Sequence, residues 1–269
     1  MPRIALIVAY NGKNYHGWQY QNESIPTIQR ELTRAISKVS AGTVTLHAAG
    51  RTDSGVHATK QVIHFDSAAV RPDKAWVLGA NVLLPEDVSV EWASEVVEDF
   101  DARRSALNRR YLYLIQNTKI RSALMHDFLA HEHRYLNVDA MNEAAQSLLG
   151  ENDFSSFRAS SCQSNSPIRN LQHIKVKRAY DVVVVDVIGN AFLHHMVRNI
   201  VGALVEVGAG EKPIDWIGEL LLLADRSAGS RTAPPQGLAL INVIYPPEFG
   251  IPEEVGLPNF YRTMDIAGL

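Results

Sequence analysis

Short strand-like and helix-like segments alternate along this chain, and this pattern constrains the fold more than any other feature. Residues 4–10 are rich in β-forming side chains, and apolar residues recur at helical spacing from 28 to 39. The other predicted strands are 44–48, 61–66, 88–93, 110–116, 174–177, 182–188 and 238–244, and the other predicted helices are 73–78, 138–149, 191–207 and 215–224. Intermixed helices and hairpin-like strand pairs indicate an α+β protein, with mainly antiparallel sheets packed by helices on one face.

The length and an acidic stretch predict two domains. A chain of 269 residues suits two domains of ordinary size. Residues 86–101 contain seven acids and no base, and the sign of the charge reverses directly afterwards. We therefore predict an N-terminal domain at 1–104 and a C-terminal domain at 105–247. Residues 248–269 form a tail that we expect to be poorly ordered.

Composition excludes several classes of protein. The single cysteine, Cys162, cannot form an internal disulfide or a clustered zinc site, so we expect a reduced, cytoplasmic protein. The longest purely aliphatic runs, 182–185 and 220–223, are far shorter than the ~20 residues of a membrane span. We therefore predict no membrane segment. None of the ten histidines has the His-Glu-x-x-His spacing of a zinc site, so we also predict no metal.

The charge distribution favours a polyanionic partner more than the net charge does. The formal net charge is −3, which by itself argues against nucleic acid. Residues 103–121, however, hold six bases and no acid, and 158–178 hold a second excess of bases. The blocks predict a local basic surface that binds phosphates, or else an ordinary solvated surface with uneven charge.

The segment 50–57 is the strongest candidate for a reactive loop. Gly50 and Gly55 permit unusual backbone angles, while Arg51, Asp53 and His57 place ionisable groups close together. Taken alone, the segment is more simply interpreted as a tight turn in which Asp53 accepts hydrogen bonds from its own backbone.

Residues 50–58, with the sequence GRTDSGVHA, closely resemble the catalytic motif of the bacterial tRNA pseudouridine synthase A family. Further motifs that resemble this family follow in its order: 10–12 and 15–19, 100 with 102–103, 109–113, 150–154, 157–158, 191–202, and 233–234 with 237–238. The similarity covers residues 3–247. Three positions depart from the usual pattern of the family, namely Asn11, Ser54 and Asp101.

The resemblance implies a function and a fold. It implies isomerisation of uridine to pseudouridine at positions 38, 39 and 40 in the anticodon stem-loop of tRNA, by a homodimer on which one tRNA spans both subunits. It implies no cofactor and no metal. The pseudouridine synthase fold that it implies has an active-site cleft between its two domains.

The resemblance also implies roles for four residues. Asp53 would be the nucleophile, acting on the sugar or on the uracil ring, and Arg198 would pair with it. Tyr111 would stack on the extruded uracil, and Arg51 would assist base flipping or anchor the loop. Judged without the resemblance, Arg198 could be a surface or structural arginine, and Tyr111 a core aromatic residue.

Two other functions remain to be distinguished from this one. The arginine blocks alone would suit a non-catalytic RNA-binding module, and the ten histidines alone would suit a metal-dependent hydrolase. Mapping of pseudouridine in tRNA from cells lacking the protein would distinguish the RNA-binding module from the synthase. Elemental analysis of the purified protein would test for the metal of a hydrolase.

Overall fold

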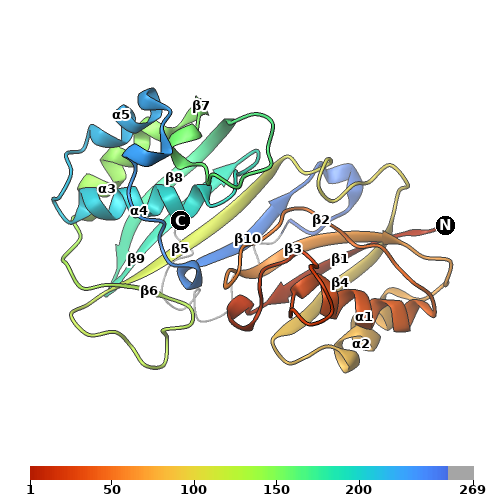
Figure 1. The fold of residues 1–269 in the computed structure, drawn as a ribbon. Coiled ribbons are helices and arrows are strands. Elements are labelled where there is room, and N and C mark those ends of the chain that lie inside the picture. The colour runs from red at the N-terminus through yellow and green to blue at the C-terminus, as the bar shows by residue number, and fades with distance from the viewer. Residues whose placement is uncertain (254–269) are drawn as a thin grey trace. The chain divides into compact units, whose positions relative to one another are not determined.

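The computed structural model describes residues 1–253, and these form two compact units (Figure 1). The first unit comprises Met1–Leu107 and takes in the chain again from Leu240, and the second comprises Asn108–Ala239. None of the described helices has both the length and the apolar character needed to cross a membrane. The short 3₁₀ helices of the described chain are η1 (Gly12–Asn14), η2 (Gln146–Leu148), η3 (Ser155–Phe157), η4 (Arg226–Ala228), η5 (Pro235–Gly237) and η6 (Pro247–Phe249).

The first unit is built on an antiparallel core of strands. Its strands are β1 (Arg3–Tyr10), β2 (His47–Ala48), β3 (His57–Asp66), β4 (Val88–Val96) and most of β10 (Leu238–Ile244). They lie in the order β4-β1-β3-β10, with β2 paired to β3. β1 is antiparallel to both of its neighbours, and Leu6 stands opposite Ile63 on β3 and Ala93 on β4. All three side chains are buried, so this register fixes the core of the unit.

Two helices, α1 (Ile28–Ser40) and α2 (Asp73–Leu83), pack together in this unit (Figure 1). Thr27 begins α1, because its side-chain oxygen accepts a hydrogen bond from Arg30 N at 3.3 Å. The buried side chains of Ile28, Leu32 and Ile36 recur along one face, as the sequence pattern predicts. The prediction of a strand over 44–48 was wrong for its first three residues, because only His47 and Ala48 pair with β3.

The second unit has the same general construction. Its strands β5 (Asn108–Asn117), β9 (Val182–Gly189), β8 (Ile168–Ala179) and β7 (Gly150–Asp153) lie in that order and are antiparallel. β6 (Ala130–Glu132) is parallel to β5. The helices α3 (Val138–Ala145), α4 (Met196–Gly208) and α5 (Trp216–Leu223) gather beside this sheet, with α3 packed on β8 (Figure 1).

The structure confirms the predicted α+β class. The compact units divide the chain at Leu107 and Asn108, and β10 lies beside β3 in the first unit. The predicted division into 1–104 and 105–247 instead places β10 in the C-terminal domain. At the start of the predicted tail, Phe249 packs against Phe100 at a ring-centroid distance of 5.3 Å. Residues 254–269 of that tail lie outside the described part of the chain.

Candidate active site

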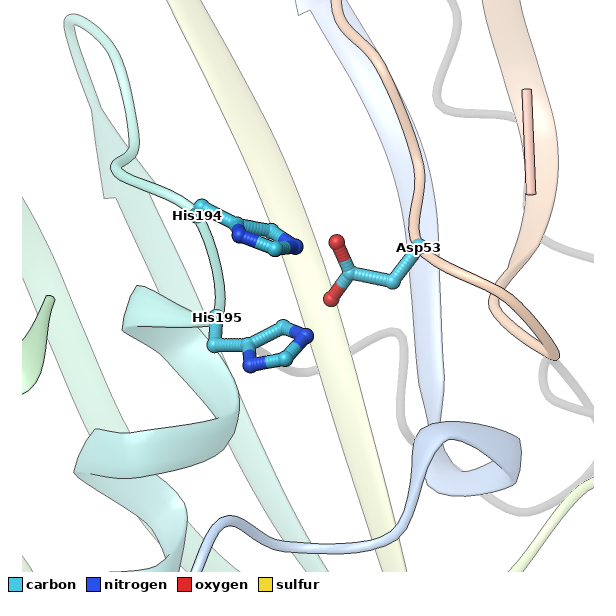
Figure 2. A group of neighbouring side chains, drawn as sticks. All are labelled: Asp53, His194 and His195. Atoms are coloured by element: carbon cyan, nitrogen blue, oxygen red, sulfur yellow. The ribbon is translucent and has the colours of Figure 1, made fainter. Parts of the chain in front are cut away.

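The loop that carries Asp53 joins β2 to β3 in the first unit (Figure 2). Asp53 is half-buried and Arg51 is exposed, while Thr52 between them is buried. Thr52 Oγ1 and Tyr10 Oη are hydrogen-bonded at 2.8 Å, and burial raises the pKa of Tyr10 to about 12. A protonated phenol at the end of β1 thus holds one side of the loop in place.

A second segment, residues 12–18, is hydrogen-bonded to the same loop. Trp18 N donates to Thr52 O at 3.0 Å, while Gly55 N and Ser54 Oγ donate to Tyr15 O at 3.3 and 3.1 Å. Gly17 has φ +85°, and a Cβ at this position would lie 2.7 Å from Thr52 O. Only glycine therefore permits the two segments to approach this closely.

His57 and Gln61 fix the two ends of the loop. Gly12 N donates to His57 Nδ1 at 3.1 Å, and Gln61 Nε2 donates to Gly50 O at 2.6 Å. Both side chains are buried on β3. A ring nitrogen that accepts a backbone hydrogen bond carries no proton, so His57 Nδ1 acts here as an acceptor that ties the end of the loop to Gly12.

Tyr111 lies on β5 in the second unit and is 7% exposed. Its ring meets Phe192 edge to face, with the centroids 5.0 Å apart and the planes at 80°. Val187 of β9 stands opposite Tyr111 in the sheet. This burial among apolar residues suits a core aromatic residue as well as a stacking role.

Arg198 lies in the first turn of α4 and is tied to the segment before β10. Its Nε donates to Ala233 O at 2.8 Å, and Ala233 N donates to Arg198 O at 3.0 Å. Tyr113 Oη donates to the next carbonyl, Pro234 O, at 2.7 Å. The conformation of the arginine is therefore set by a segment more than thirty positions along the chain.

A polar network around Asn199 holds this segment against α4. Asn199 Oδ1 accepts hydrogen bonds from Thr232 Oγ1 at 2.7 Å and from Arg226 Nη2 at 3.1 Å, while its Nδ2 donates to Phe157 O at 2.8 Å. The residue is 3% exposed, and we did not predict its role from the sequence. A buried asparagine among the mostly apolar residues of this helix is the one signal that could have identified it.

The predicted helix 191–207 begins five residues too early. α4 starts at Met196, because His195 adopts φ 63° and turns the chain out of the helical path. His194 and His195 lie in the loop before α4, with ring centroids 4.0 Å apart (Figure 2). His194 N donates to Cys162 Sγ at 3.4 Å. Burial alone would raise the pKa of the Cys162 thiol, but backbone hydrogen bonds and Arg158 lower it below its usual value.

The three departures from the usual motif residues all make local hydrogen bonds. Asn11 Oδ1 accepts from Lys13 N at 3.1 Å, and Ser54 contacts Tyr15 O as described above. Asp101 Oδ1 accepts from the backbone N–H groups of Arg103 and Arg104, each at 2.9 Å. Asn11 and Asp101 thus support their own turns, whereas Ser54 connects the loop of Asp53 to Tyr15.

The four predicted site residues fall in different units. Arg51 and Asp53 belong to the first unit, and Tyr111 and Arg198 belong to the second. Their roles, including the pairing of Asp53 with Arg198, stay predictions.

Comparisons with known proteins identify the family. The family model described as tRNA pseudouridine synthase matches residues 6–103 and 144–246. A "tRNA pseudouridine synthase A" of Pasteurella multocida is 52% identical over 261 residues, covering 97% of this chain and 98% of the relative. The protein of that name from Actinobacillus pleuropneumoniae is 50% identical over 258 residues, covering 96% and 98%. The one from Shewanella amazonensis is 51% identical over 251 residues, covering 93% and 96%.

A solved structure gives a much weaker match. A chain of a Cbf5-Nop10-Gar1 complex has a TM-score of 0.36 and 12% sequence identity, over 88% of this chain and 48% of that chain. This similarity is too low to inform the fold. The family model and the near full-length relatives, by contrast, agree with each other, and the chain belongs to the tRNA pseudouridine synthase family.

Proposed function

We propose that this enzyme, an isomerase of the tRNA pseudouridine synthase family, acts on uridines 38, 39 and 40 in the anticodon stem-loop of tRNA. Membership of the family and the names of its close relatives support a tRNA uridine as the substrate. The observation that carries the proposal is the loop of Asp53, which resembles the catalytic motif of the family and is held by hydrogen bonds on both sides.

The reaction requires a group that can attack and later leave unchanged. The bond between C1′ of the ribose and N1 of uracil breaks, the ring rotates, and C1′ bonds to C5 instead. C5 then loses its proton, and N1 gains one, so the product has the same composition as the substrate. A carboxylate can form and release a covalent adduct in such a sequence, and we assign this role to Asp53. Attack on the sugar and attack on the uracil ring both remain compatible with this assignment.

Three further residues complete the proposed site. The guanidinium of Arg198 would hold the Asp53 carboxylate in its charged form. Tyr111 would stack on the extruded uracil, and Arg51 would either fill the space left by the flipped nucleotide or anchor the loop. Extrusion is needed because the reacting atoms cannot be reached inside a stacked stem, and unstacking costs a few kcal/mol.

The partners follow from the same resemblance. We propose that the enzyme works as a homodimer, that one anticodon arm engages both subunits, and that the isomerisation proceeds without a metal or an organic cofactor. The basic stretch 103–121 would neutralise phosphates of the arm, since it contains six bases and no acid.

The test is substitution of Asp53. We expect Asp53→Asn and Asp53→Ala to form no pseudouridine in a tRNA transcript, while the dissociation constant for tRNA stays within about threefold, because neither change removes a cation. Chemical mapping of the product positions by mass spectrometry measures both activity and site. Undiminished product from Asp53→Ala would contradict the nucleophile assignment, and product at positions other than 38 to 40 would contradict the site assignment.

A further inference from the structure

We propose that Tyr15 is a positioning residue for the loop of Asp53, which it connects to the beginning of β4. The inference rests on the proposed role of Asp53 and deepens it. Tyr15 itself is 6% exposed and lies between the two elements that it joins. Its side chain contacts Asp87 on one side, and its backbone carbonyl contacts the loop on the other.

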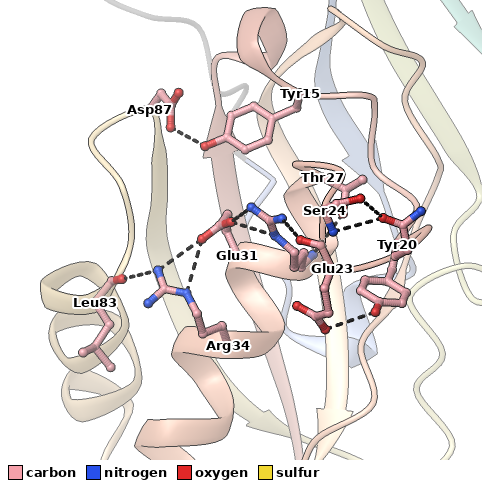
Figure 3. Close-up of polar contacts among 11 residues, drawn as sticks. Tyr15, Tyr20, Glu23, Ser24, Thr27, Glu31, Arg34, Leu83 and Asp87 are labelled. Carbon is pink, nitrogen blue, oxygen red and sulfur yellow. Dashed lines mark hydrogen bonds and ion pairs between the residues drawn. The ribbon is translucent and has the colours of Figure 1, made fainter.

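The side chain provides the anchor. Tyr15 Oη donates a hydrogen bond of 2.5 Å to Asp87 Oδ1 (Figure 3). Burial, and then the Asp87 carboxylate, raise the pKa of the Tyr15 phenol, so that it stays protonated and able to donate. Asp87 is held in turn, because its backbone oxygen accepts from Asn11 N at 2.9 Å and the next residue begins β4.

The carbonyl of Tyr15 provides the support for the loop. It accepts two hydrogen bonds, from Gly55 N at 3.3 Å and from Ser54 Oγ at 3.1 Å. The donors are the two residues that follow Asp53. A displacement of the Tyr15 backbone would therefore be passed directly to the backbone that sets the direction of the Asp53 carboxylate.

Contacts other than that of the Tyr15 side chain also hold the segment 12–18 in place. His16 N donates to Pro26 O at 2.9 Å, and Gln29 N donates to Trp18 O at 3.0 Å, so the segment is also attached at the start of α1. Loss of the phenol contact alone should shift the segment rather than unfold it. Misplacement of a catalytic group by a fraction of an ångström lowers the rate of the chemical step more than it lowers substrate binding.

The experiment compares four single variants of the full chain acting on a tRNA transcript. Tyr15→Phe and Asp87→Ala each remove the hydrogen bond, and we expect each to lower kcat about 10-fold while KM changes less than about 2-fold. Asp87→Asn keeps an oxygen that can accept from the phenol, so its kcat should recover to within about 3-fold of the original. Tyr20→Phe is the matched control, because it removes a similar bond, of 3.1 Å to Glu23, at the surface.

The double variant Tyr15→Phe/Asp87→Ala tests whether the two residues act as one unit. We expect its kcat to equal that of either single variant. An unchanged kcat in Tyr15→Phe, or equal losses in Asp87→Asn and Asp87→Ala that follow their melting temperatures, would overturn the inference. Activity in Asp53→Ala would overturn the proposed function and this inference together. An inactive Asp53→Ala beside a fully active Tyr15→Phe would overturn this inference alone.

Discussion

His64 is a buried histidine on β3 that links the sheet of the first unit to the segment following β4. Its ring is 3% exposed and stacks on His47, with the centroids 4.9 Å apart. Ala102 N donates to His64 Nδ1 at 3.0 Å, so this nitrogen carries no proton. Burial, and next the neighbouring His47, lower the pKa of His64 to about 4.

This histidine makes stability depend on pH. An unfolded histidine titrates near pH 6.5, so below that value the unfolded chain gains a proton that the folded chain does not bind until about pH 4. The stability that comes from a neutral His64 is complete above pH 6.5, and it is lost as the pH falls from 6.5 to about 4. We expect about 2 kcal/mol of unfolding free energy to be lost from this group between pH 7 and pH 5.

Urea unfolding at pH 7 and pH 5 measures this loss. His64→Asn offers an oxygen to Ala102 N but does not titrate, so the loss between the two pH values should become smaller by about that amount. His133→Asn is the control, because His133 is exposed, with 74% of its side chain accessible. An equal pH dependence in the protein and in His64→Asn would contradict the assignment.

Sequence patterns point to candidate residues that lie in a local motif, but not to partners that meet only through the fold. The loop from Gly50 to His57 could be identified because its glycines and ionisable groups are adjacent in the sequence. The contact between Tyr15 and Asp87 joins residues 72 positions apart, and that between Asn199 and Thr232 joins residues 33 apart. No local pattern specifies such pairs, since each depends on the packing of several elements.

At the scale of elements, α4 and the segment that precedes β10 behave as one assembly. Gly202 faces this segment so closely that a Cβ would lie 2.0 Å from Arg231 O. The same segment supplies Thr232 to Asn199 and Ala233 to Arg198. The close approach at Gly202 therefore sets how the beginning of α4 presents Arg198.

Gly202→Ala should destabilise the protein although alanine favours helices. The added methyl group must displace a backbone carbonyl, which costs about 1 to 3 kcal/mol. Gly218→Ala in α5 is the matched control, because its Cβ would meet only Ser147 at 3.7 Å, an ordinary contact. That variant should be neutral or about 1 kcal/mol more stable. Chemical denaturation measures both, and equal effects of the two substitutions would show that the approach at Gly202 is unimportant.

Helix periodicity identified the elements better than it identified their ends. The predicted helix 138–149 is α3 followed by η2, because the chain tightens after Ala145. The leucine-rich segment 215–224 could have served the core or an interface between subunits. In α5, Ile217 and Leu220 are fully buried, whereas Leu222 is 88% exposed. Its inner face belongs to the core, and composition alone could not show which leucines face outward.

At the scale of the whole molecule, the net charge of −3 conceals the basic stretch 103–121. The side chain of Arg104 is 88% exposed, and its nearest acid, Asp101, lies 3.7 Å away. Arg110 in the same stretch forms a bidentate pair with Asp186 at 2.8 and 2.7 Å. Part of the positive charge is thus committed to structure, and we propose that exposed residues such as Arg104 contact the phosphates.

We expect tRNA affinity to depend steeply on salt despite the negative net charge. If about four phosphates are neutralised, affinity should fall by roughly 50-fold to 150-fold between ~50 and ~200 mM salt. Arg104→Gln should lower the log-log slope by about one. Arg71→Gln, an exposed arginine outside the basic stretch, should leave the slope unchanged. A tRNA affinity that does not change with salt would mean that the net charge of the protein, and not the basic stretch, governs binding.

The position of β10 beside β3 has a consequence for biosynthesis. β3 begins at His57, directly after the loop of Asp53, and its neighbour in the sheet is formed by residues 238–244. The same late part of the chain supplies Tyr245 and Pro252, whose atoms bond to Ala102 O and to Lys60 Nζ in the first unit. A nascent chain thus completes the whole second unit on the ribosome before the sheet that supports Asp53 can close. Strand β3 must therefore wait, with an unpaired edge, until residues 238–244 have been synthesised.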